Sequence, residues 1–193
     1  MPAPKILVLP GSTRTGSHNV KLAALAAKEL TLIDADVTRI SLADYPLPLY
    51  EGDLESKGGP PANALRLKQM IMAHHGIFIA SPEYNASVTP LLKNAIDWVS
   101  RVRERGDPTY AAFKGRVFAI SSASPEAAGG LRSLMALRQI LELGCGALVI
   151  PEQVAIQQAD HAFDEMDNIA DIRIANLFRA QLARLVDMAR LLA

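Results

Sequence analysis

The sequence predicts an α/β fold, in which a five-stranded parallel sheet lies between two layers of helices. Short, continuous apolar runs alternate with longer segments whose apolar residues recur at helical spacing. Continuous apolar runs are typical of strands that are buried on both faces, as in parallel sheets. The chain has 193 residues, half of them hydrophobic, and no repeat or linker divides it. We therefore expect residues 1–193 to form a single domain.

Five short runs predict the strands. The first begins at Lys5, is otherwise apolar, and stops at Gly11 and Ser12. The second alternates between polar and apolar residues, which indicates a less buried strand. The predicted strands span residues 5–9, 36–40, 76–80, 116–120 and 147–150.

Five longer segments predict helices. Ser17 suits the N-cap of the first helix, and Pro90 suits the first turn of the third. Residues 42–61 are rich in proline, glycine and acidic residues and predict a long loop, a feature that is often functional. The predicted helices span residues 17–30, 62–74, 90–103, 130–143 and 166–192.

The alternation of strands and helices predicts right-handed crossovers that place helices on both faces of the sheet. A sheet of five such strands fits the flavodoxin-like three-layer sandwich with strand order 2-1-3-4-5. In that order, ligands bind beyond the carboxyl ends of the first and third strands.

A loop rich in hydroxyl groups follows the first strand. Between residues 10 and 19 it reads PGSTRTGSHN, and its serines and threonines surround the guanidinium of Arg14. The loop opens onto a helix N-terminus, where unpaired N–H groups and the helix dipole favour an anion. Arg14 can add a charge-assisted bond. The loop therefore predicts a phosphate site, with an ordinary capped turn as the alternative.

The same loop lacks the motifs of two other phosphate sites. It has no Gly-Lys-Ser/Thr, and Gly-x-Gly-x-x-Gly does not occur in it. The sequence thus disfavours ATP and a Rossmann-type NAD site, and it leaves the phosphate of a mononucleotide.

Two further loops are expected at the same edge of the sheet. Residues 81–90 place Tyr84 where its aromatic face can pack against a flat ring, or else partly in the core. Residues 121–130 are mostly small, which lets a ligand approach the backbone closely. Three such loops at successive strand ends indicate a binding site more strongly than any one of them alone.

These motifs resemble those of the NADPH-dependent FMN reductase family, which includes quinone, chromate and azo-dye reductases. The resemblance covers roughly residues 5–150. It rests on Gly11-Ser12-x-Arg14-x-x-Ser17-x-Asn19, on Leu47-Pro48-Leu49-Tyr50, on Ser81-Pro82-Glu83-Tyr84-Asn85, on Leu92-Lys93-Asn94-Ala95-x-Asp97-Trp98 and on Gly129-Gly130.

The resemblance implies FMN as cofactor, NADPH or NADH as electron donor, and a homodimer or homotetramer. No side chain is expected to be strictly catalytic, because the flavin carries the redox chemistry. By position, Ser12, Arg14, Ser17 and Asn19 would hold the FMN phosphate with His18 beside them, Pro82, Glu83, Tyr84 and Asn85 would hold the isoalloxazine ring, and Ser122 would flank the ring or the ribityl chain.

The expected function is an NAD(P)H-dependent FMN oxidoreductase. It would reduce a small acceptor such as a quinone, free flavin, chromate or an azo compound by ping-pong hydride transfer. One alternative is a non-enzymatic flavodoxin-type electron carrier, which the formal net charge of zero disfavours because such carriers are typically acidic. Another is a phosphate-binding hydrolase, for which the first loop lacks a cysteine or aspartate nucleophile.

Composition argues against several other partners. Twenty basic and 20 acidic residues, with no basic run, argue against nucleic acid. No apolar stretch reaches the roughly 18 residues of a membrane span, and no secretory signal is recognisable, so we expect a cytoplasmic protein. Cys145 lies in an apolar run and is expected to be a buried small hydrophobe. His74 and His75 lack a third ligand nearby and are not expected to bind metal.

Overall fold

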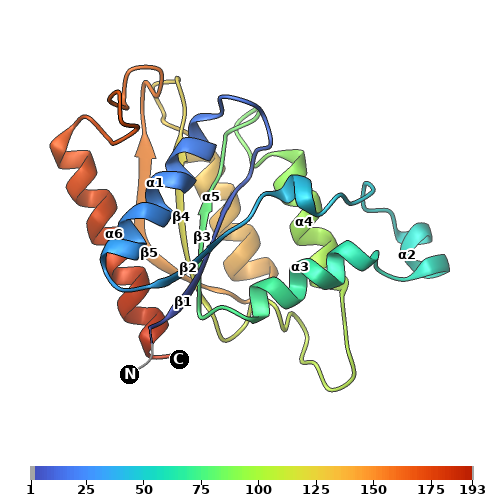
Figure 1. Cartoon of the computed structure of the whole chain (residues 1–193). Helices are drawn as coiled ribbons and strands as arrows, with labels where there is room; N and C mark the ends of the chain where they lie inside the picture. Colours follow the sequence, from blue (N-terminus) through green and yellow to red (C-terminus); the bar gives the residue numbers. More distant parts are fainter. Residues whose placement is uncertain (1–2, 193) are drawn as a thin grey trace.

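The computed structural model describes residues 3–192, and its centre is a five-stranded sheet in the order β2-β1-β3-β4-β5 (Figure 1). All neighbouring strands are parallel, which confirms the predicted flavodoxin-like fold. The carboxyl ends of the strands therefore share one edge of the sheet. The strands are β1 (Lys5–Pro10), β2 (Asp36–Arg39), β3 (Gly76–Ala80), β4 (Val117–Ala123) and β5 (Leu148–Ile156).

Six α-helices occur in the described residues. Helices α1 and α6 cover one face of the sheet, and α3, α4 and α5 cover the other (Figure 1). The helices are α1 (His18–Leu32), α2 (Gly52–Gly58), α3 (Ala62–Met72), α4 (Pro90–Arg101), α5 (Leu131–Gln139) and α6 (Ile172–Arg190).

Successive side chains of each strand divide between two hydrophobic cores, because they point to opposite faces of the sheet. Ile6 and Val8 pack with α1 and α6, whereas Leu7 and Leu9 pack with α3, α4 and α5. Helices cover both faces, so both sets of side chains must be apolar. This explains why the strands are continuous apolar runs in the sequence.

The predicted long loop of residues 42–61 contains a short helix, α2. The carboxylate of Glu51 caps it by accepting hydrogen bonds from the N–H groups of Asp53 (2.8 Å) and Leu54 (2.9 Å). None of its residues is buried, so no apolar periodicity marks it in the sequence. Glu55 ties it to the rest of the chain, accepting hydrogen bonds from the Tyr50 hydroxyl (2.8 Å) and from Nε of Arg101 (2.9 Å).

Strands β4 and β5 are longer than the sequence predicts. Residues 121–123, expected in a loop, continue β4 and are buried, so Ser122 is a strand residue. Strand β5 runs on past Pro151 to Ile156, and its register with β4 shifts between Phe118 and Ile120. Proline cannot donate a ladder hydrogen bond, and such irregularities are where a strand tolerates it.

All five predicted helices differ in their limits from those in the structure: α1, α3 and α4 differ by one or two residues at an end, and the last two predicted helices differ more. The helix predicted for residues 130–143 is α5, which ends at Gln139 and is followed by a π-helical turn over Ile140–Gly144. The last helix begins at Ile172 rather than near residue 166. Asp171 caps this start, because its carboxylate accepts a hydrogen bond from the N–H of Arg173 (2.8 Å). Across residues 3–192, no helix is both long and apolar enough to cross a membrane.

Candidate functional site

Three loops meet at the carboxyl edge of the sheet, after β1, β3 and β4. Together they line one hollow of about 100 Å³, which we call the α1 hollow. Eight of the ten predicted site residues line it, and Asn85 and Ser122 do not. Its lining also includes Ala123, Ser124 and Pro125, which follow Ser122 in the chain. The lining residues from the prediction are Ser12, Arg14, Ser17, His18, Asn19, Pro82, Glu83 and Tyr84.

The loop after β1 turns tightly before α1. The N–H of Arg14 donates to Oγ of Ser12 at 3.2 Å, and the N–H of Ser17 donates to the carbonyl of Arg14 at 3.2 Å. Gly16 has a φ of +71°, a left-handed conformation that favours glycine. The turn places Ser17 at the N-cap position, immediately before α1.

The start of α1 has unused hydrogen-bond donors. Ser17 occupies the predicted N-cap position, but its hydroxyl makes no cap bond. Within residues 3–192, the backbone N–H groups of His18 and Asn19 make no hydrogen bond either. The one side-chain hydrogen bond of Arg14 among the described residues is donated by its guanidinium to the carbonyl of Thr15, at 3.3 Å. These donors suit an anionic oxygen cluster such as a phosphate.

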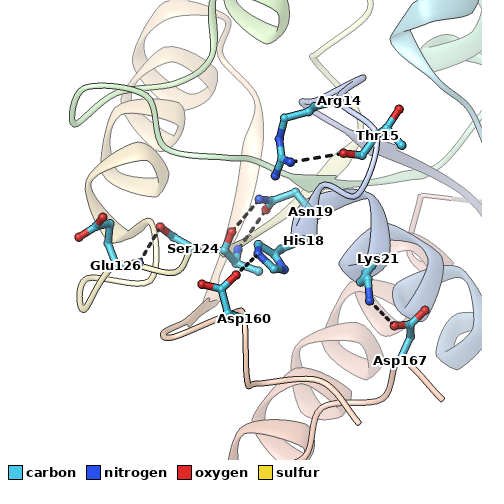
Figure 2. A network of polar contacts seen from close by, with 10 residues as sticks. Arg14, Thr15, His18, Asn19, Lys21, Ser124, Glu126, Asp160 and Asp167 are labelled. Carbon is cyan, nitrogen blue, oxygen red and sulfur yellow. Dashed lines mark hydrogen bonds and ion pairs between the residues drawn. The ribbon is translucent and has the colours of Figure 1, made fainter. Parts of the chain in front are cut away.

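Asn19 joins the first turn of α1 to β4 (Figure 2). Its Nδ2 donates to the carbonyl of Ala123 at 2.8 Å, and its Oδ1 accepts from the N–H of the same residue at 3.0 Å. The side chain is buried. Asn19 therefore holds the N-terminus of α1 against the end of β4, and its carboxamide oxygen is already occupied.

His18 faces the loop that follows β5 (Figure 2). Its Nε2 lies 3.0 Å from Oδ1 of Asp160, and its ring is parallel to that of Phe163 with centroids 6.5 Å apart. Its Nδ1 is buried and has no hydrogen-bond partner in the described part of the chain. Asp160 and Phe163 are distant in sequence, and no local motif pointed to them.

Glu83 anchors the loop after β3 to the start of α5. Its carboxylate accepts hydrogen bonds from the N–H groups of Arg132 (3.1 Å) and Ser133 (3.3 Å), and it forms an ion pair with the Arg132 side chain. Oγ of Ser133 donates to the carbonyl of Pro82 at 2.8 Å. Because the carboxylate is engaged in this way, Glu83 can contribute to a ligand site chiefly through its backbone.

The same loop ends in a strained turn. Tyr84 and Ser87 exchange two backbone hydrogen bonds, of 2.9 and 3.0 Å. Between them, Asn85 and Ala86 have φ values of +50° and +62°. Asparagine tolerates this region, whereas alanine pays roughly 1–2 kcal/mol. The turn leaves the Tyr84 side chain about half exposed beside the α1 hollow.

Ser122 is buried in β4 rather than lining the α1 hollow. Its Oγ makes no hydrogen bond to any residue between 3 and 192. Gly130, which precedes α5 with a φ of +86°, lies against it, and a Cβ at position 130 would stand 1.9 Å from that oxygen. Only glycine fits there without a shift of the neighbouring strand.

The titratable residues Cys145 and His74 are buried and do not line the α1 hollow. Cys145 is buried as expected, and burial raises the pKa of its thiol to about 11. Burial also lowers the pKa of His74, whose Nδ1 lies 2.7 Å from the carbonyl of Met70. No group of three or more His, Cys, Asp or Glu residues in the described chain could hold a metal ion. A larger hollow of about 620 Å³, beyond β5, is lined by none of the predicted site residues.

Comparison with known proteins identifies the family. The family model described as NADPH-dependent FMN reductase matches residues 4–161. An NAD(P)H-dependent FMN reductase of Pseudomonas aeruginosa is 37% identical over 183 residues, which cover 94% of this chain and 92% of that protein. A quinone reductase of Escherichia coli K12 is 36% identical over 138 residues, or 71% of this chain and 69% of that protein.

Among solved structures, the flavoenzyme NAD(P)H:(acceptor) oxidoreductase FerB of Paracoccus denitrificans superposes with a TM-score of 0.79. It is 27% identical, and the match covers 97% of this chain and 98% of that one. The family description contains both the cofactor and the electron donor that the sequence predicts, FMN and NADPH. The chain belongs to the NADPH-dependent FMN reductase family and is an oxidoreductase with the flavodoxin-like fold.

Proposed function

We propose that this chain binds FMN in the α1 hollow, oxidises NAD(P)H and reduces a small acceptor such as a quinone. One observation carries the proposal: the unused donors of Arg14, Ser17 and the first turn of α1 converge on a hollow beside the loop of Tyr84. That combination fits a phosphate at one end and a flat ring at the other. The names of the relatives, FMN reductase and quinone reductase, favour the same activity.

The size of the α1 hollow bears on how FMN would lie. Its volume, about 100 Å³, is well below the roughly 300 Å³ at which pockets that enclose drug-sized ligands begin. It suits a phosphate and the start of a ribityl chain. We propose that the isoalloxazine ring lies outside it, over residues 82–85, where the exposed Tyr84 side chain and the loop backbone are within reach.

When bound, FMN supplies the redox chemistry by taking hydride from NAD(P)H and giving the electrons to the acceptor. The chain's own residues bind FMN and orient it. Arg14 and Ser17 hold the phosphate, Asn19 fixes the helix that presents the N–H groups, and Glu83 fixes the loop beneath the ring. An exposed ring face would serve donor and acceptor in turn, so we propose ping-pong kinetics.

The phosphate assignment is tested by titrating FMN into the apoprotein and into its Arg14→Ala variant. Losing a charged hydrogen bond of roughly 1.5–3 kcal/mol should weaken FMN binding about 10- to 100-fold. The matched control is Arg184→Ala, because Arg184 is an exposed α6 residue outside both the hollow and the ion pairs of residues 3–192. Equal FMN affinity in wild type and Arg14→Ala would refute the assignment.

Anaerobic NADPH then separates the enzyme from the alternative electron carrier. Bleaching of the bound-flavin bands by NADPH or NADH supports the reductase. Bound flavin that neither donor reduces supports a flavodoxin-type carrier instead.

We also propose a cytoplasmic homodimer or homotetramer. Light scattering on the purified FMN-loaded protein measures the oligomeric state, and a monomer would overturn that part of the proposal.

A further inference from the structure

A second hollow lies next to the α1 hollow, on the other side of Arg14. Its volume is about 410 Å³, and we call it the β2 hollow because its lining includes the end of β2 and the residues that follow. The two hollows share Ser12 and Arg14. The side chains that matter here are those of Thr13, Arg14, Thr15, Arg39, Ser41 and Asp44.

The β2 hollow contains an arginine, Arg39, that does not line the α1 hollow. Arg39, the last residue of β2, is exposed and makes neither a side-chain hydrogen bond nor an ion pair with any residue between 3 and 192. Arg14, the other arginine of this lining, also lines the α1 hollow and is the one assigned to the FMN phosphate. Asp44 is the one carboxylate in the described lining, and it pairs with neither arginine. With Arg14 assigned to the FMN phosphate, the guanidinium of Arg39 remains to bind a second anion.

Hydroxyl groups complete this lining. Oγ of Ser41 accepts a hydrogen bond from the N–H of Ala43 at 3.2 Å, so its own O–H remains available to donate. The hydroxyls of Thr13 and Thr15 border the same space. Guanidinium groups and hydroxyl donors together are the chemistry that recognises a phosphate monoester.

The position of Arg39 points to a particular phosphate. Residues 36–39 pair with β1 residues 5–8, so Arg39 stands at the same sheet edge as the α1 hollow. In dinucleotide-binding α/β folds, an arginine near the end of the second strand accommodates the 2′-phosphate of NADP, where an acidic residue binds the free ribose of NAD. This chain lacks the glycine fingerprint of those folds, so the parallel lies in position and charge alone.

We propose that the β2 hollow binds the 2′-phosphate of NADPH, with Arg39 as its main ligand, and that this residue makes the protein prefer NADPH to NADH. The inference rests on the proposed function and names the donor that it uses. The two hollows share Ser12 and Arg14, so the proposed donor-phosphate site adjoins the FMN site. Arg14 borders both hollows, so its substitution would affect the FMN phosphate as well as the NADPH phosphate. Arg39 borders the β2 hollow but not the α1 hollow, so its substitution tests the NADPH phosphate separately.

The test uses the FMN-loaded protein and its Arg39→Ala and Arg39→Lys variants, with Arg184→Ala as the matched control. We expect Arg39→Ala to lower kcat/KM for NADPH roughly 10- to 100-fold, mainly through KM. Turnover with NADH and the affinity for FMN should not change. Arg39→Lys should restore part of the preference, since it keeps the charge but not the planar fork.

A second readout is independent of turnover. Calorimetry with adenosine 2′-monophosphate should show binding to wild type and to Arg184→Ala, and at least tenfold weaker binding to Arg39→Ala. Equal binding to all variants, or equal losses for NADPH and NADH, would overturn the proposed phosphate site. If neither donor reduces the wild-type flavin while adenosine 2′-monophosphate still requires Arg39, the proposed function fails and the anion site stands.

Discussion

Asn19, in the first turn of α1, forms two hydrogen bonds with the backbone of Ala123, the last residue of β4. Its amide nitrogen donates at 2.8 Å and its carboxamide oxygen accepts at 3.0 Å. The residues are 104 positions apart in the sequence and both are buried. This contact fixes the distance between two of the loops that form the α1 hollow.

Replacing Asn19 with alanine should reduce the free energy of unfolding of the apoprotein by about 2–3 kcal/mol, because it leaves the buried N–H and carbonyl of Ala123 unpaired. Urea unfolding measures the change. Asn19→Asp keeps the bond from the Ala123 N–H but places a buried carboxylate oxygen against the Ala123 carbonyl, so it should not restore the stability. If Asn19→Ala weakens FMN binding but leaves the apoprotein as stable as wild type, Asn19 contacts the phosphate directly.

Replacing Glu83 with alanine should remove the cap of α5 and the anchor of the loop after β3. Loss of such a cap costs about 1–2 kcal/mol, and freeing the loop should also weaken FMN binding. Glu83→Gln retains one acceptor oxygen and should recover part of both effects. Urea unfolding and FMN titration provide the measurements, and wild-type values for Glu83→Ala in both would contradict the anchoring role.

Cys145 should be unreactive in the folded protein. Burial raises the pKa of its thiol to about 11, and thiolate is the reactive species. At pH 8 a disulfide reagent such as dithionitrobenzoate should label the native protein very slowly and the urea-unfolded protein at once. Rapid labelling of native protein would show that the thiol is accessible.

His74 should make the protein less stable below neutral pH. Burial lowers the pKa of its ring in the folded state, so the unfolded chain binds this proton first as the pH falls below about 6.5. The free energy of unfolding then decreases by at most about 1.4 kcal/mol per pH unit until the folded pKa is reached. His74→Gln removes the titration and should flatten the curve between pH 5 and 7. Parallel curves for the two proteins would exclude this group as the cause.

The sequence predicts the sheet well because both faces of the sheet are buried. Strand β3 has the predicted limits, Gly76–Ala80, since nearly every residue in it must be apolar. The prediction fails at the ends of β4 and β5, where buried serines and a proline continue the strands. Helix α2 is missed for the opposite reason, because none of its residues is buried and polar contacts of Glu55 tie it to the chain.

In the candidate site, residues of one contiguous motif could be predicted from the sequence, whereas contacts between residues far apart in the sequence could not. Ser12, Arg14 and Ser17 form a motif that a single stretch of sequence reveals. The partners of Asn19, Glu83 and His18 lie 49 to 142 residues away. One sequence contains no signal for such pairings, which arise only when parallel strand ends meet at one edge.

The crowding between Gly130 and Ser122 restricts how this protein can be recombined or evolved in the laboratory. A Cβ at position 130 would stand 1.9 Å from Oγ and 2.7 Å from Cβ of Ser122. Residues 122 and 130 should therefore come from the same parent in a chimaera. Chimaeras with a crossover between β4 and α5 should be enriched in misfolded products. Saturation libraries should return glycine at 130 and only the smallest side chains at 122.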